Sequence, residues 1–127
     1  MFSFKENPII CSDTVKKYFP RDFLEKAGYI AEKIDKDIIS NNTNCDIRCI
    51  SATKFRDIGY KTHQICFVLN NYEINKALRF YLYYGDHCTI SIKLEEGEFT
   101  ILKMTFVQFE EALNIFISIL SILLFND

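Results

Sequence analysis

Five glutamates in the C-terminal third of the chain are the first residues whose types and spacing suggest chemistry. They are Glu95, Glu96, Glu98, Glu110 and Glu111. Carboxylates are ordinary in a solvated turn and in the first turn of a helix, where they favour the helix dipole. Gathered on one acidic surface, they would instead steer and hold a basic protein. We expect them to contribute to a partner-binding surface, although a six-residue strand between the two groups would separate them by about 20 Å.

A second set of residues combines aromatic rings with a guanidinium group. Segment 77–84 has the composition of a strand, although its apolar residues also fit a helical stripe. On a strand, Arg79, Tyr81 and Tyr83 share one face. Tyrosine and arginine are frequent anchors of protein interfaces. The sequence therefore predicts these three residues as partner-binding anchors, with an aromatic face covered by a helix as the alternative.

The cysteines and histidines match no metal-binding or catalytic pattern. On a strand, Cys45 and Cys49 would stand about 13 Å apart, too far to share one zinc ion. Cys66 lies in an apolar run, which raises the pKa of a thiol, and His63 should lie on the opposite face. No nucleophile elbow, zinc-protease motif or phosphate loop is present. We expect no metal, cofactor or enzymatic activity, with a small Cys/His enzyme as an alternative.

Composition and charge exclude several classes of function. A chain of 127 residues is long enough to bury a core, and we expect residues 1–127 to form a single domain. The net charge is −2 and no dense basic patch is present, so nucleic acid is not an expected partner. The N-terminal ten residues do not resemble a signal peptide, and five cysteines without a C-x-x-C motif are typical of reduced thiols. We expect a cytoplasmic protein without a membrane partner.

Hydrophobic periodicity predicts a helix near each end of the chain. Ser12 or Asp13 is expected to cap a short helical turn that precedes a longer helix at about 21–40. Thr105 and Gln108 match a capping box at the start of a second helix, at about 106–125. Between the two long helices, alternating residues predict strands, at 45–53, 58–69, 77–84, 87–94 and 99–104.

These elements predict an α+β fold, in which an antiparallel β-meander of four to five strands is flanked by an N-terminal and a C-terminal helix. The apolar run at 65–69 has the composition of a central or covered strand. Asn70 and Asn71 are expected to form a two-residue hairpin turn after it.

The C-terminal helix is unusual because segment 112–125 contains no charged residue. This segment is too short to span a bilayer, which requires about 20 apolar residues. Ile115, Ile119 and Ile122 lie off the core-facing stripe, so the helix must be buried on most sides. Three interpretations remain open: the helix is sandwiched between the sheet and the first helix, forms a homodimer seam, or presents a docking or membrane-contact surface.

Together these features favour a non-enzymatic module that binds a protein partner. In its length, acidity and absence of catalytic residues, the chain is similar to small immunity proteins that neutralise bacterial toxins. The resemblance implies that the partner is a toxin, and the glutamates favour a basic one such as a nuclease. The alternative is an acidic secretion chaperone that holds a secreted client and dimerises through the helix at 106–125.

Overall fold

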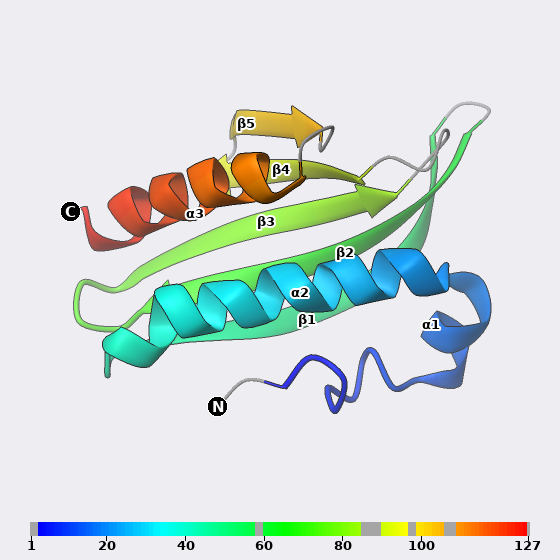
Figure 1. Cartoon of the computed structure of the whole chain (residues 1–127), viewed down its shortest axis with the longest axis horizontal. Helices are drawn as coiled ribbons and strands as arrows, with labels where there is room; N and C mark the ends of the chain where they lie inside the picture. Colours follow the sequence, from blue (N-terminus) through cyan, green and yellow to red (C-terminus); the bar gives the residue numbers. More distant parts are fainter. Residues whose placement is uncertain (1–2, 58–59, 85–89, 97–98, 106–108, 127) are drawn as a thin grey trace.

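The computed structural model describes residues 3–57, 60–84, 90–96, 99–105 and 109–126 (Figure 1). Within them the helices are α1 (Asp13–Tyr18), α2 (Arg21–Asp37), the 3-10 helix η1 (Ile39–Asn41) and α3 (Phe109–Phe125). The strands are β1 (Cys45–Asp57), β2 (Tyr60–Asn71), β3 (Lys76–Tyr84), β4 (Ile90–Glu96) and β5 (Phe99–Thr105). All pair antiparallel in the order β1-β2-β3-β4-β5, which confirms the predicted α+β meander.

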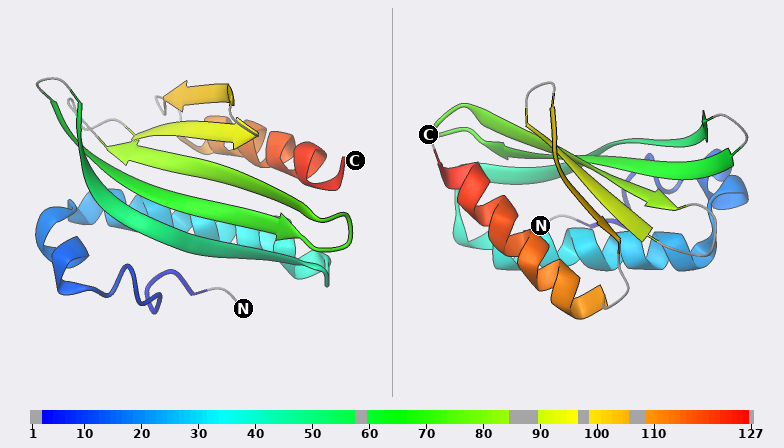
Figure 2. Two further views of the ribbon diagram at one scale, coloured as in Figure 1. Left: turned by 180° about the vertical axis from the view of Figure 1, so that it is seen from behind. Right: turned by 90° about the horizontal axis from the view of Figure 1, so that it is seen from above.

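Both long helices pack against the same face of the sheet, as Figure 2 shows from above. α2 lies over the side of β1, and α3 lies over β2 and β3 (Figure 1). The aromatic rings of Phe67 on β2, Phe80 on β3 and Phe116 on α3 form the centre of the core, with centroid distances of 5.2 and 5.3 Å. The other face carries no helix among the described residues.

Local sequence explains where the first two helices begin and end. The Ser12 hydroxyl accepts a hydrogen bond from the Val15 amide at 3.3 Å and caps α1, as predicted. Pro20 lies at the N-cap of α2, whose apolar stripe is fully buried against the sheet. α2 ends at Asp37 and the chain tightens into η1, so the regular helix is shorter than the predicted 21–40.

The hairpin turn predicted at Asn70 and Asn71 is wrong. β2 continues through both residues, and Asn71 pairs with Cys45 on one side and Lys76 on the other. The Asn71 side chain faces the core, where its Nδ2 donates to the Leu124 carbonyl at 3.1 Å. The turn follows at 72–75 and ends at Asn75, whose φ of 52° lies in the left-handed region that asparagine tolerates.

The interpretation of α3 as a helix sandwiched between the sheet and α2 is also wrong. α3 lies beside α2, and the two meet where the Phe109 ring packs on Tyr29 at 5.6 Å. Because the sheet covers only one side of α3, Ile115 remains 53% exposed and Ile122 67% exposed. Gln108 of the predicted capping box lies outside the described residues, so that cap stays a prediction.

Asn71 links the C-terminal end of α3 to the β2–β3 turn, and its loss should destabilise the fold. Its amide donates to Leu124 and accepts from the Glu73 amide at 3.1 Å, while only 3% of the residue is exposed. We expect Asn71→Ala to lower the free energy of unfolding by about 1–3 kcal/mol in urea denaturation, because it strands a buried carbonyl. Asn70→Ala is the matched control, since Asn70 points to the other face and binds Asp46. Equal losses in the two variants would contradict this role.

Candidate functional site

The face of the sheet opposite α2 and α3, here called the open face, is the candidate site. Along β3, fully buried side chains under the helices alternate with more exposed ones on the other side. The latter include Arg79, Tyr81 and Tyr83, so the structure brings the three predicted anchors together. Figure 2 shows this face from behind, with the strands in front of both helices. The alternative of a face covered by a helix does not hold for the described residues.

The two tyrosines form a continuous aromatic surface. The rings of Tyr81 and Tyr83 stack with centroids 6.2 Å apart and an interplanar angle of 29°. Burial raises the pKa of Tyr81 to about 12, and the nearby Cys66 and Glu95 add to the shift. The Tyr81 hydroxyl lies within hydrogen-bonding reach of the Glu95 carboxylate and the Cys66 sulfur. Both phenols therefore stay neutral at physiological pH, and Tyr81 is held in place from two sides.

Glu95 lies on the open face but is already paired. The Lys93 Nζ approaches Glu95 Oε1 at 3.3 Å, and both side chains are about one-third exposed or less. Across the strands, Lys93 is in register with Tyr81 and Glu95 with Arg79. The Glu95 carboxylate is thus paired with a cation on its own strand.

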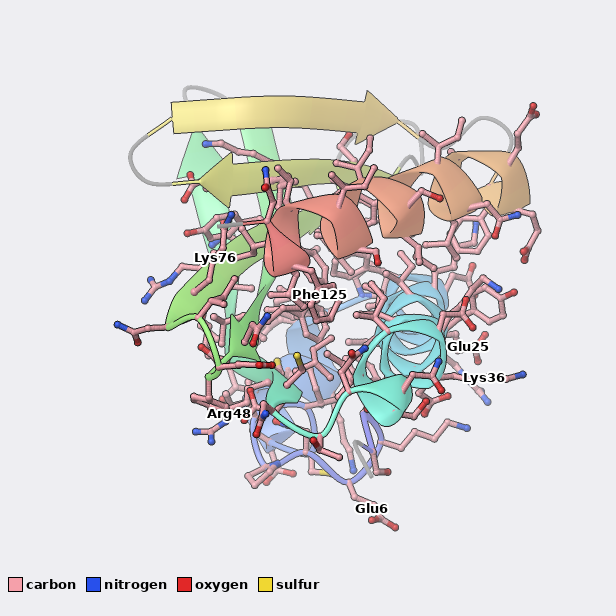
Figure 3. The ribbon with its side chains drawn as sticks, turned by 90° about the vertical axis from the view of Figure 1, so that its left-hand side faces the viewer. Glu6, Glu25, Lys36, Arg48, Lys76 and Phe125 are labelled. Atoms are coloured by element: carbon pink, nitrogen blue, oxygen red, sulfur yellow. The ribbon has the colours of Figure 1, made fainter. Side chains whose placement is uncertain are left out.

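A second paired carboxylate lies on the open face at the opposite edge. Asp46 Oδ1 accepts from Asn70 Nδ2 at 2.8 Å, and its Oδ2 accepts from the Tyr72 hydroxyl at 2.7 Å and from Arg48 Nε at 3.1 Å. Burial alone would raise the pKa of the Asp46 carboxyl, but these three donors outweigh it and lower the pKa. Figure 3 shows Arg48 projecting from the open side, while Glu25 and Lys36 project from the helical side.

The structure does not bring the predicted glutamates into one surface. Glu110 and Glu111 are exposed in the first turn of α3, on the helical side of the sheet. The nearby Glu110 carboxylate raises the pKa of the Tyr29 phenol on α2. Glu95 lies on the other face, and the Glu96 and Glu98 side chains lie outside the described residues. The cause is that α3 packs on the helical face of the sheet, whereas Glu95 points to the open face.

Sequence reasoning missed three residues that belong to the open face. Arg48, Val68 and Lys93 alternate with buried core residues on β1, β2 and β4. Val68 is in register with both Arg48 and Arg79, so the apolar floor of the face lies between two guanidinium groups. The two-residue alternation that identified Arg79 also applies to these three residues. Grouping them on one surface requires the order of the strands, which the sequence does not give.

The predicted separation of thiol and imidazole is confirmed. Cys66 lies on the open face in register with Ser51 and Tyr81, whereas His63 packs on Phe19 at 4.8 Å on the helical side. Burial raises the pKa of the Cys66 thiol, which opposes nucleophilic use. Among the residues that the structure describes, no three histidine, cysteine or acidic side chains gather as a metal site would require. Cys45 and Cys49 both lie on β1, as expected.

His63 should make the stability of the fold depend on pH. Its Nδ1 is buried without a hydrogen-bond partner among the described residues, and its ring lies between Phe19 and Tyr84. Burial lowers its pKa, and the positive charge of Lys54 lowers it further. Below about pH 6.5 the unfolded chain takes up a proton that the folded chain resists, so the free energy of unfolding should fall as pH drops from about 7 towards 5.

Urea denaturation across this pH range checks the assignment. His63→Phe should flatten the pH dependence relative to the unmodified chain, because it removes the depressed imidazole while keeping a ring in place. His87→Phe changes the only other histidine and serves as the control. The assignment to His63 is wrong if the slope is unchanged in His63→Phe or flattens equally in both variants.

Thiol reactivity separates a binding module from a Cys-based enzyme. Cys11 is exposed, whereas Cys49 and Cys66 are buried, and burial raises the pKa of Cys49 to about 12. We expect iodoacetamide to modify Cys49 and Cys66 at least about tenfold more slowly than Cys11, since each pKa unit lowers the thiolate fraction tenfold. Peptide mapping by mass spectrometry after timed pulses measures the three rates in one sample. Modification of Cys66 as fast as Cys11 would support the enzyme alternative.

Comparison with known proteins gives no independent indication of function. Protein-family models, curated proteins and solved structures were compared with the chain, and none of them matches it. Of the helices in the described part of the chain, none combines the length and the apolar character needed to cross a membrane.

Proposed function

We propose that this chain is a non-enzymatic protein-binding module that contacts its partner through the open face. One observation carries the proposal: a sheet of five described strands has helices on one side only, and its other side presents stacked tyrosines beside an exposed arginine. Tyrosine and arginine contribute a large share of binding energy where they are buried at an interface. Tyr81 and Tyr83 are only partly exposed, so little side-chain freedom is lost on binding.

The polar groups of the open face support a binding role over a catalytic one. The Asp46 carboxylate is bound by neighbouring donors, Glu95 forms an ion pair with Lys93, and the Cys66 thiol is buried beneath the surface. A general acid, base or nucleophile would need an unsatisfied group aimed at a substrate. Fixed ion pairs and hydrogen bonds instead hold the aromatic surface in one arrangement, which favours recognition.

The finer proposal is an immunity-type protein that binds and neutralises a cognate bacterial toxin in the cytoplasm. It is supported by the short acidic chain and by a sheet whose second face carries no helix among the described residues. A neutralising protein needs only to occlude its target, so it requires affinity without chemistry of its own. The anchors would be Arg79, Tyr81 and Tyr83, and Glu95 would hold Tyr81 in position.

The second candidate is a homodimeric secretion chaperone, which α3 favours. Ile115 and Ile122 lie about two turns apart on the side of α3 that the sheet leaves uncovered. Exposed isoleucines at this spacing are typical of helices that pair with a second apolar surface. In that function the client would bind elsewhere, and Ile122→Glu should convert a dimer into a monomer in light scattering.

Photo-crosslinking in the cells that naturally produce the chain tests the choice between these functions. A photoreactive phenylalanine replaces Tyr83 on the open face, Tyr29 on α2 or Ile122 on α3. We expect one dominant protein adduct from position 83 and none from position 29, which is the matched tyrosine on the helical side. An adduct from position 122 alone, with the mass of two copies of this chain, would favour the chaperone and contradict the proposal.

Co-production of the cross-linked partner tests neutralisation separately. We expect the partner to arrest growth when produced alone, and the chain to restore growth when both are produced. Tyr83→Ala should reduce this protection while leaving the protein folded, because Tyr83 is on the surface side of β3. Tyr29→Ala should protect fully. A partner without toxicity would retain the binding function and overturn the immunity proposal.

A further inference from the structure

On the open face, both described carboxylates form ion pairs, whereas one described cation does not. Its described side chains include two carboxylates, and each is bound by a cation on its own strand: Asp46 by Arg48 at 3.1 Å and Glu95 by Lys93 at 3.3 Å. Asp46 also accepts hydrogen bonds from two neutral donors, Asn70 and Tyr72. Each of these carboxylates therefore already has a cationic partner within the chain.

Among the described side chains of the open face, Arg79 is the cation that takes no part in these ion pairs. It is exposed, and it forms no ion pair within 4.0 Å among the described residues. Glu95 is in register with it across the strands but is bound by Lys93 instead. The guanidinium therefore keeps its five donors available for a ligand.

The residues around Arg79 would contact the part of the ligand that adjoins its charged group. Val68 is in register with Arg79 on β2 and is 9% exposed, which gives an apolar floor. Tyr81 follows two residues along β3 on the same face, and Tyr83 stacks on Tyr81. A guanidinium beside an apolar and aromatic surface matches a carboxylate that neighbours an apolar side chain.

We propose that the open face binds an acidic segment of its protein partner, in which an aspartate or glutamate pairs with Arg79 and an adjacent apolar residue rests on Val68, Tyr81 and Tyr83. The inference rests on the proposed function and specifies the partner's chemistry. It reverses the expectation of a basic partner, which assumed that the glutamates of the chain form one surface. Arg79 and the tyrosines would then determine specificity, and the glutamates would not.

Selection from a library of random 12-residue peptides displayed on phage tests the inference without knowledge of the partner. Peptides are selected on the intact chain, and affinities of the winners are measured by fluorescence anisotropy. We expect enrichment of aspartate or glutamate next to aromatic or aliphatic residues. Affinity should fall about tenfold or more in Arg79→Gln, which corresponds to losing one charge-assisted pair. Glutamine avoids placing a second acid opposite Glu95.

Arg21→Gln is the matched control, because Arg21 is an exposed arginine on the helical side whose side chain is 91% accessible. It should leave peptide affinity unchanged, and circular dichroism should show that both variants fold. Two kinds of peptide that lose affinity for the Tyr83→Ala variant would overturn the inference: peptides without acidic residues, and peptides whose affinity is unchanged by Arg79→Gln. Either result would retain the proposed binding function.

Two further outcomes would also overturn it. The first is a selection in which no peptide depends on either Arg79 or Tyr83; the cross-linking from position 83 then decides the binding function on its own. The second is a dimer in light scattering that Tyr83→Ala converts to a monomer, which would make the open face an interface between two copies of this chain.

Discussion

A column of four phenylalanine rings holds together the parts of the chain that are farthest apart in sequence. Phe4 of the N-terminal segment packs on Phe67 of β2 at 6.1 Å, Phe67 on Phe80 of β3 at 5.2 Å, and Phe80 on Phe116 of α3 at 5.3 Å. Phe67, Phe80 and Phe116 are fully buried, so each contributes its whole side-chain area to the core. The column lies on the helical face of the sheet, and α3 contributes the Phe116 ring to it.

β2 is apolar on both of its faces, although helices cover only one of them. Phe67 and Leu69 point into the core, whereas Cys66 and Val68 point to the open face and are nonetheless 1% and 9% exposed. On the neighbouring strands they are flanked by longer side chains, Tyr81 opposite Cys66 and Arg48 and Arg79 opposite Val68. Tyr81 on β3 is the clearest case, since its hydroxyl reaches the Cys66 sulfur. The residues that shield β2 are therefore the same residues that form the candidate binding surface.

Local pattern was sufficient to predict the elements but not their arrangement in space. Strand alternation placed Arg79, Tyr81 and Tyr83 on one face, and the apolar run identified β2 as covered. The turn after β2 was misplaced because the Asn71 side chain bonds to Leu124, 53 residues away, and a local turn rule contains no such partner. The prediction that α3 is sandwiched between the sheet and α2 is wrong for a similar reason. An apolar helix requires burial, yet its sequence does not say how much of it the sheet will cover.

The grouping of charges depends on this arrangement more than on composition. The chain carries a net charge of −2, which taken alone suggests an acidic surface and a basic partner. Yet at physiological ionic strength charges are screened over about 8 Å, so a partner docking on one face responds to the charges of that face. Among the described side chains of the open face, Asp46 and Glu95 are paired with Arg48 and Lys93, while the guanidinium of Arg79 forms no ion pair. An overall acidic protein can thus present a locally cationic site, and the pairing of individual side chains decides which partner it attracts.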